Sequence, residues 1–230
     1  MIGFLKIKYI YFLISLFFLL TSCDELLNRA IIPKSEILSI YISPKIDQYK
    51  INSVALLPMA PDDTTDSGTF FATNHFFNSL KKKFPNTKFA VPLVDSVLAY
   101  DSLAIATIID SVEKLRRLDL KYFFGSDIGY TLKENDADAV LIGMINEIIY
   151  KKGYKSGKVI YQTIYATLTS CQFTYYLISL KDGRVLWKAN IIGEEGYYLS
   201  GNDEKFVPLD YSISNGIDKI IDIIPLINSK

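Results

Sequence analysis

The first strong pattern in the body of the chain is the apolar run VALL at residues 54–57, which Pro58 ends. A short apolar run bounded by a proline predicts a strand that is buried on both faces. The polar loop PDDTTDSG comes next, and residues 69–84 then predict a helix, with an N-cap at Asp66 or Ser67. The apolar positions of this helix fall at roughly helical spacing. They are Phe70, Phe77, Leu80 and Phe84.

The middle of the chain alternates strands with helices. Residues 86–94 predict a second strand, and residues 103–120 carry the apolar periodicity of a strongly amphipathic helix. Its apolar positions are 105, 108, 109, 112, 115 and 118. A shorter helix is predicted over 127–138, and a buried strand follows over 138–150 with Gly143 in its middle.

The last third of the chain is rich in strand-forming residues. Residues 161–180 are dense in Thr, Tyr, Ile and Phe, which favours an extended strand. A second such run covers 185–198, and the pair Asp182-Gly183 between the two runs predicts a β-hairpin. A final helix is predicted over 211–224, because its isoleucines recur on one helical face before Pro225. They are Ile213, Ile217, Ile220, Ile221 and Ile224.

These elements follow one another in the order β-α-β-α-α-β-β-β-α. Strands that alternate with helices predict crossover connections within a single sheet. We therefore expect an α/β fold with a mixed central sheet of about five strands and with helices packed on that sheet. The last strands are expected to form a C-terminal antiparallel hairpin.

The N-terminus carries a different pattern. Lys6 and Lys8 precede a nearly unbroken apolar run over residues 9–20. This run is shorter than the roughly 20 apolar residues of a membrane-spanning helix, and it follows a basic segment, as in a secretory signal. It ends at LTSC, residues 20–23, which resembles the lipobox of bacterial lipoproteins. The resemblance implies lipidation of Cys23; a plain secretory signal and an uncleaved anchor helix are the alternatives.

The predicted organisation therefore has three parts. Residues 1–22 form a lipoprotein signal peptide, residues 23–45 a lipidated tether, and residues 46–230 a single α/β domain. We expect acyl chains such as palmitate on the cysteine, because two or more chains anchor a protein stably whereas one binds only marginally. Within the tether, the stretch EILSIYISP can still add a short strand or pack on the body.

The charge balance excludes one class of partner. The chain has 25 basic and 25 acidic residues, and without Lys6 and Lys8 the predicted mature chain carries a net charge of −2. This balance argues against a nucleic-acid-binding or polybasic membrane surface. Cys171 is the only other cysteine, and its setting in TLTSCQFTYY predicts a small, buried, apolar side chain.

The acidic loop with Asp62, Asp63 and Asp66 is the best candidate for metal chemistry. It follows a predicted buried strand and offers the oxygen ligands that Mg²⁺ or Ca²⁺ prefer. Its spacing matches no EF-hand, and Asp and Ser are also ordinary turn and capping residues. His75, the only histidine, lies in an aromatic helix and has no nucleophile motif to serve. No phosphate-loop, dinucleotide or zinc motif occurs, so we expect neither enzyme activity nor a cofactor.

Three segments resemble one family of envelope lipoproteins. They are the buried strand VALLPMAP, the strand ADAVLIGMI at 137–145, and the hairpin YYLISLKDGRVLWKA at 175–189. These segments are similar to the superfamily that includes CsgG, the N-terminal domain of TolB, LpoB and small GNA-type lipoproteins. The resemblance covers residues 51–198 and implies an α/β lipoprotein of the bacterial envelope.

The motifs that carry this resemblance have structural explanations. Asp138 precedes a buried strand and can cap or close a turn there. Gly143 lets another group pack close to the sheet. Trp187 gives a large side chain to one sheet face, and its indole N–H needs an acceptor.

We expect a lipid-anchored protein that faces the periplasm and acts as a non-catalytic binding or assembly module in envelope biogenesis or secretion. Its partner is expected to be another envelope protein or a second copy, and not a nucleic acid. Tyrosines of the late strands are candidates for a partner-binding face, since tyrosine is enriched at interfaces. They are Tyr150, Tyr154, Tyr161 and Tyr165.

Two alternatives stay open. One is a metal-assisted hydrolase that uses Asp62, Asp63 and Asp66. The other is a subunit of an oligomeric CsgG-like secretion pore, which the family resemblance implies for some members. Residues 150–165 and the region around residues 123–130 are the candidate pore inserts. The first carries lysines and lacks the alternating segments of a membrane barrel. The choice between inner and outer membrane also stays open, since Asp24 resembles a retention signal that only some bacteria use.

Overall fold

The computed structural model describes residues 35–60, 66–90, 102–126, 129, 136–155, 165–198 and 206–226. The strands are β1 (Ser35–Ile42), β2 (Ser53–Leu56), β3 (Lys88–Ala90), β4 (Ala139–Lys155), β5 (Tyr165–Ser179) and β6 (Val185–Tyr198). The helices are α2 (Asp66–Lys83), α4 (Ser102–Leu115), α5 (Leu120–Gly125) and α7 (Leu209–Ile223), with a 3₁₀ turn, η1, at Ile46–Gln48.

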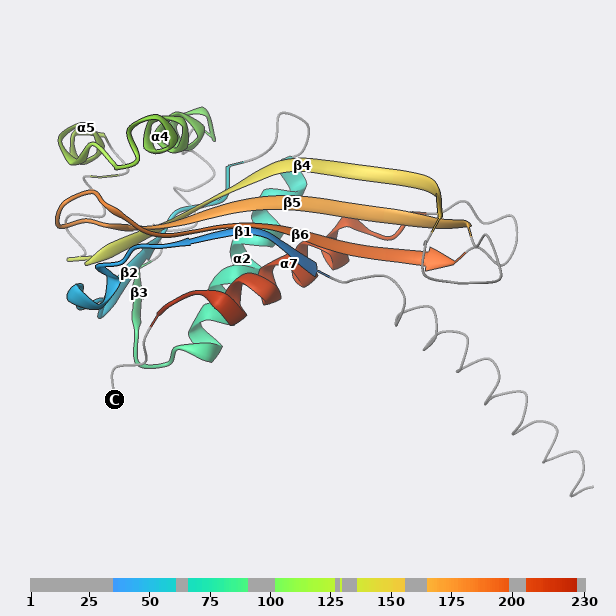
Figure 1. Ribbon diagram of the computed structural model, residues 1–230, viewed down its shortest axis with the longest axis horizontal. Helices are drawn as coiled ribbons and strands as arrows, with labels where there is room; N and C mark the ends of the chain where they lie inside the picture. Colours follow the sequence, from blue (N-terminus) through green and yellow to red (C-terminus); the bar gives the residue numbers. More distant parts are fainter. Residues whose placement is uncertain are drawn as a thin grey trace, which may run out of the picture.

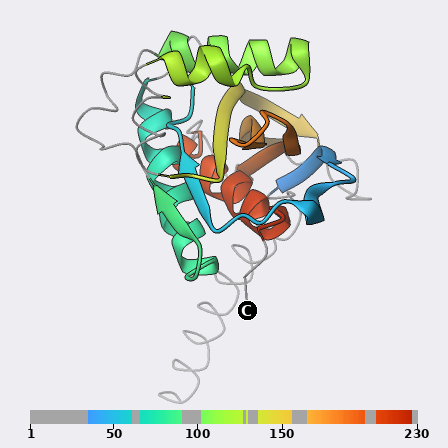
Figure 2. The ribbon, with the colours of Figure 1, turned by 90° about the vertical axis from the view of Figure 1, so that its left-hand side faces the viewer.

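These elements form three layers (Figure 1). The middle layer is a six-stranded sheet with the strand order β1-β6-β5-β4-β2-β3. Helices α4 and α5 lie on one face of the sheet, and α2 and α7 lie on the other (Figures 1 and 2). The predicted α/β fold is therefore confirmed, including its helix-covered mixed sheet.

Strand directions divide the sheet into a parallel part and an antiparallel part. β2 runs parallel to both of its neighbours, β3 and β4. From β4 onward each neighbouring pair is antiparallel, through β5 and β6 to β1. All four residues of β2 are buried, because helices cover both faces at this point. The run at residues 54–57 is thus the doubly buried strand that its composition predicts.

The sixth strand, β1, belongs to the segment predicted as a tether. It pairs with β6 at the edge of the sheet, with Ile40 opposite Ala189. The sequence left this possibility open for the stretch EILSIYISP. The sheet has one strand more than the predicted five for this reason.

Two hydrophobic cores lie on the two sides of the sheet. The larger one is under α2 and α7 and contains Trp187, Tyr175 and Phe173. All five predicted isoleucines of the final helix are buried in it. Gly143 has the predicted role, since a Cβ there would lie only 2.6 Å from a ring carbon of Tyr175.

Two glycines lie at a close contact between α7 and the sheet. A Cβ on Gly193 of β6 would lie 2.0 Å from the carbonyl oxygen of Ser212 and 2.5 Å from the backbone nitrogen of Gly216 in α7. A Cβ on Gly216 would in turn lie 2.5 Å from the Phe173 ring. The axis of α7 can therefore lie closer to the strands than side chains would allow.

Two helix predictions need correction. In α2 the buried face contains Phe76 and not Phe77, which is half-buried, because the inward positions recur every four residues. They are Ala72, Phe76 and Leu80, and Phe84 continues the series directly after the end of the helix. The helix predicted over 103–120 ends at Leu115, because Arg116 adopts a left-handed φ of 54°.

A second helix does follow α4, but it lies before the predicted range. Asp119 caps it, accepting hydrogen bonds from the backbone N–H groups of Lys121 (3.0 Å) and Tyr122 (3.2 Å). Most of the range predicted for the shorter helix, 127–138, lies outside the described residues.

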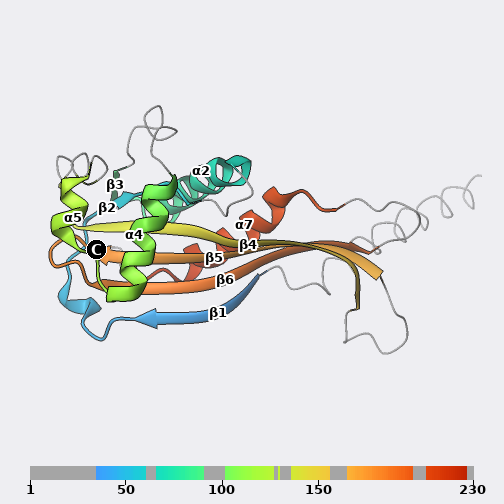
Figure 3. The same cartoon turned by 90° about the horizontal axis from the view of Figure 1, so that it is seen from above.

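The hairpin between β5 and β6 has the predicted turn. Gly183 adopts a φ of 73°, which only glycine takes without strain. The Gly183 N–H donates to the Ser179 carbonyl at 2.9 Å, and the Ser179 N–H donates to the Arg184 carbonyl at 2.9 Å. Strands β4, β5 and β6 run on well past α4, which crosses the sheet near this turn (Figure 3).

Candidate functional site

The outer edge of β1 is the first candidate for function. Among the described strands, none pairs with this edge. Four large apolar side chains of β1 are about half exposed, which is unusual for a strand with no charged residue after Glu36. They are Leu38 (44 %), Ile40 (43 %), Tyr41 (49 %) and Ile42 (52 %). Proteins normally protect such edges with lysine, proline or bulges, and the one irregularity here lies between Ile37 and Ser39. Within the part of the chain that the structure describes, the segment from Ser39 to Ile42 is therefore an apolar sheet edge without a strand partner.

The second candidate is a cleft of about 560 Å³ beside the β5–β6 turn. Its walls come from the segment after η1, the residues before β4, and the turn itself. The lining residues are Gln48, Tyr49, Lys50, Ile51, Ala137, Asp138, Ser179, Leu180, Lys181, Asp182 and Leu186.

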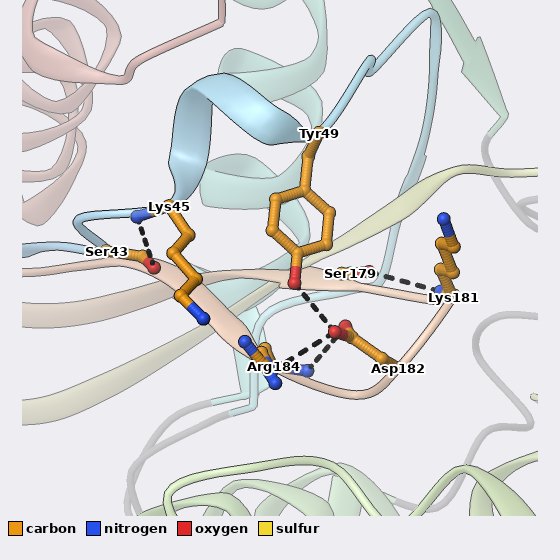
Figure 4. A network of polar contacts seen from close by, with 7 residues as sticks. All are labelled: Ser43, Lys45, Tyr49, Ser179, Lys181, Asp182 and Arg184. Carbon is orange, nitrogen blue, oxygen red and sulfur yellow. Dashed lines mark hydrogen bonds and ion pairs between the residues drawn. The ribbon is translucent and has the colours of Figure 1, made fainter.

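A polar network fixes one wall of this cleft (Figure 4). The Tyr49 hydroxyl donates to Oδ2 of Asp182 at 2.6 Å, and Nε of Arg184 lies 3.2 Å from the same oxygen. The hydrogen bond to Asp182 is the main reason why the pKa of Tyr49 is raised. Burial alone would raise the pKa of Asp182, but hydrogen bonds from Tyr49, the Arg184 backbone and Ser179 outweigh it and lower that pKa. The Asp182 carboxylate thus connects the end of η1 to the β5–β6 turn, and we call the Tyr49–Asp182 hydrogen bond the strut of the cleft.

Asp138 has the capping role that its position before a buried strand predicts. Its Oδ2 accepts hydrogen bonds from the backbone N–H groups of Asn52 (2.8 Å) and Ser53 (3.0 Å). The hydroxyl of Ser53 donates to the Asp136 carbonyl at 2.8 Å. These bonds tie the start of β2 to the start of β4, so this carboxylate in the cleft is also a structural group.

A third polar cluster attaches α4 to the sheet. Oε1 of Glu113 accepts hydrogen bonds from the Tyr176 hydroxyl and from Nζ of Lys188, the latter at 2.9 Å. Nζ of Lys188 also lies 5.0 Å from the centre of the Tyr176 ring. The hydrogen bond from Lys188, followed by that from Tyr176, lowers the pKa of Glu113. Burial, followed by the bond to Glu113, raises the pKa of Tyr176.

We expect Glu113→Gln to lower the free energy of unfolding by less than about 1 kcal/mol at pH 7, because Glu113 is half exposed and solvent screens its charge. A lowered pKa in the folded protein stabilises it above the ordinary glutamate pKa of about 4.3. This contribution should disappear as the pH falls through the lower, folded-state pKa. Urea unfolding at pH 7 and pH 3 measures the difference.

The matched control is Asp110→Asn on the same helix, which removes an exposed pair with Lys114. The control should change the urea midpoint at pH 7 less than Glu113→Gln does. A Glu113→Gln effect that is equally large at pH 3 and pH 7 would contradict the role given to the carboxylate charge.

Several predicted site residues lie outside the described part of the chain. Cys23, Asp62, Asp63 and Tyr161 are among them, and of Asp66 only the backbone, at the start of α2, is described. The lipidation site and the acidic loop therefore stay predictions. Within the described ranges, no three His, Cys, Asp or Glu side chains gather closely enough to hold a metal ion.

The predicted tyrosine face is only partly described. The Tyr150 side chain is half exposed and packs edge-on against Phe206, with ring centres 5.3 Å apart. Tyr154 and Tyr165 lie near the distal ends of β4 and β5, where they are described as backbone only. A partner-binding role for these residues stays a prediction.

Of the remaining singled-out residues, His75 and Cys171 have ordinary structural positions, and Trp187 fills the sheet face as predicted but without the expected acceptor for its indole N–H among the described residues. His75 is half-buried on α2, and Nε2 lies 3.2 Å from Oδ1 of Asp218 in α7. Cys171 is a buried thiol in the larger core. Trp187 is fully buried, and its Nε1 has no hydrogen-bond partner in the structure as described. None of the described helices has the length and apolar character that crossing a bilayer requires.

Sequence reasoning missed the β1 edge, the Tyr49–Asp182 strut and the Glu113 cluster. The edge had a signal in the sequence, since the stretch ILSIYIS contains no charged residue that would protect an edge strand. The two polar clusters had no recognisable signal in the sequence, because the residues that they join lie 63 to 133 positions apart along the chain.

No protein-family model and no curated protein matches the sequence. Solved structures do match the fold. A PelC dodecamer from Paraburkholderia phytofirmans is 14 % identical, with 81 % of this chain and 94 % of that chain covered and a TM-score of 0.44. The lipoprotein GNA1162 from Neisseria meningitidis is 14 % identical, with 66 % and 87 % covered and a TM-score of 0.36.

A minor lipoprotein from Acinetobacter baumannii is 6 % identical, with 76 % of this chain and 90 % of that chain covered and a TM-score of 0.36. The chain is thus similar in structure to PelC and to these two lipoproteins, at low sequence identity. This similarity concerns the fold alone.

Proposed function

We propose that this chain is a lipid-anchored protein of the bacterial cell envelope that faces the periplasm and acts by binding, not by catalysis. The anchor is Cys23, at the end of the signal-like segment. Eleven residues separate Cys23 from Ser35, the first residue of β1. At about 3.5 Å per residue, this spacer keeps β1 within roughly 40 Å of the membrane surface.

The observation that carries this proposal is the exposed edge of β1. It presents apolar side chains and backbone groups that no other described strand pairs with, on the element that immediately follows the anchor segment. Adding a strand to such an edge is a common way for proteins to bind extended segments, since backbone hydrogen bonds supply affinity and side chains supply specificity. The edge therefore suits an accessory or assembly protein whose partner is another envelope protein or a second copy.

The polar clusters of the body also favour binding over catalysis. Asp182, Asp138 and Glu113 each accept hydrogen bonds that join two separate elements. A general base or nucleophile instead needs a lone pair directed at a substrate. These carboxylates stiffen the sheet that presents the β1 edge.

In intact cells, a photo-crosslinking amino acid at Ile42 is expected to give a single discrete adduct, since this side chain lies at the binding edge. The matched control is Tyr211, which is similarly exposed (55 %, against 52 % for Ile42) but belongs to α7 and not to the β1 edge. Gel mobility and mass spectrometry identify the adduct. Identical adduct patterns at the two positions, or no adduct at Ile42, would contradict binding through this edge.

A further inference from the structure

The backbone N–H and C=O groups of successive β1 residues point alternately toward β6 and toward the free edge of the sheet. The Ser43 N–H donates to the Leu186 carbonyl of the neighbouring segment at 2.8 Å, so the backbone groups of Ser43 point toward β6. In an antiparallel strand, successive residues point their N–H and C=O groups to opposite sides. The backbone of Tyr41 therefore also points toward β6, and that of Ile40 and Ile42 points outward.

The side chains alternate between the two faces of the sheet in the same way. Ile40 and Ile42 pair with Ala189 and Trp187, which both belong to the core under α7. Tyr41 pairs with Lys188 and so lies on the opposite face, the one that α4 covers in part. Ile40 and Ile42 thus carry both the outward backbone groups and the exposed apolar side chains on the α7 face.

We propose that a second copy of this chain occupies the edge, through antiparallel pairing of β1 with the partner's β1. This inference rests on the proposed function in one respect, namely that the β1 edge is a binding surface. The pairing would join the two sheets into one continuous sheet around a two-fold axis.

The register of this pairing follows from the faces of the strand. A two-fold axis perpendicular to the sheet keeps the α7 layers of both copies on one face, so residues of like parity must lie opposite each other. The irregularity between Ile37 and Ser39 restricts regular pairing to the part of β1 that follows it. The register that fits is Tyr41 opposite the partner's Tyr41, with Ile40 opposite the partner's Ile42.

This register uses the groups that the edge leaves open. Ile40 and the partner's Ile42 both point their backbone groups outward, so they form a pair that exchanges two hydrogen bonds. Their side chains meet on the α7 face, where both are about half exposed in a single copy. The segment Ser39–Ser43 contains no charged residue, so a second copy meets no like charge there.

The experiment is disulfide crosslinking of the full chain in its membrane. Opposed tyrosines in this register form a non-hydrogen-bonded pair with Cα atoms about 4.5 Å apart, which is within the disulfide range. Tyr41→Cys is therefore expected to give a covalent dimer rapidly under mild oxidation. Tyr211→Cys is the control, since it is exposed to a similar extent (55 %, against 49 % for Tyr41) and lies on α7.

A second pair of variants does not depend on disulfide chemistry. Tyr41→Lys places two like charges opposite each other, so the dissociation constant of the detergent-solubilised dimer should rise at least about tenfold. Tyr211→Lys should leave it unchanged. Analytical ultracentrifugation measures both variants.

Three results would overturn the inference. They are a monomeric wild-type chain, equal crosslinking of Tyr41→Cys and Tyr211→Cys, and faster crosslinking of Ile40→Cys than of Tyr41→Cys. The first of these, together with a crosslink from Ile42 to a different envelope protein, would reject self-pairing and leave the proposed function intact. No adduct of any kind at Ile42 would reject both.

Discussion

Gly193→Ala is expected to lower the free energy of unfolding by about 3 kcal/mol, because it forces a methyl group into a well-packed contact. The new Cβ would meet the Ser212 carbonyl oxygen at 2.0 Å and the Gly216 nitrogen at 2.5 Å. Both atoms belong to the backbone of α7, so no side-chain rotation can relieve the overlap. The helix would have to shift as a unit and lift its isoleucines from the sheet.

Urea unfolding followed by fluorescence measures this effect, since Trp187 is the only tryptophan and lies in the same core. Gly125→Ala is the matched control, because a Cβ there has no atom within 4 Å. We expect the control to keep the wild-type midpoint. If Gly193→Ala also kept the wild-type midpoint, that result would contradict the close packing of α7 on β6.

Periodicity predicted the elements whose burial is one-sided or complete. In α7, isoleucines at helical spacing predicted the buried face. Four of them are buried in the helix, and the fifth, Ile224, is buried directly after its end. The β5–β6 hairpin followed from Asp182-Gly183, because the turn requires a positive φ that glycine supplies. Such signals are local, so the sequence alone contains them.

Elements with competing local signals were predicted less well. In α2, aromatic residues occur on more than one side, and only packing against the sheet selects Phe76 over Phe77. In the predicted helix 103–120, Leu118 continues the apolar pattern and is buried, although it lies after the end of α4. Burial alone does not require helix, because a connecting segment can fill the same core.

The candidate site was harder to predict than the fold. The edge position of β1 depends on the strand order, which places β6 between β1 and the rest of the sheet. No local pattern encodes that order. The strut from Tyr49 to Asp182 spans 133 positions and is likewise visible only after folding.

Cys23→Ser is expected to abolish the proposed lipid anchoring of the chain completely. Each buried methylene of an acyl chain contributes about 0.8 kcal/mol to membrane binding, so two or more chains hold a protein stably. Serine offers no thiol for the lipid. The variant should therefore lose metabolically incorporated palmitate and leave the membrane fraction of lysed cells.

Cys171→Ala is the control, because Cys171 is the only other thiol in the chain and lies buried in the core. The most direct measurement is the incorporation of labelled palmitate into the wild-type chain and these two variants in growing cells. We predict label in the wild type and in Cys171→Ala, and none in Cys23→Ser. An unlabelled wild type, or label retained by Cys23→Ser, would contradict a lipid anchor at this position.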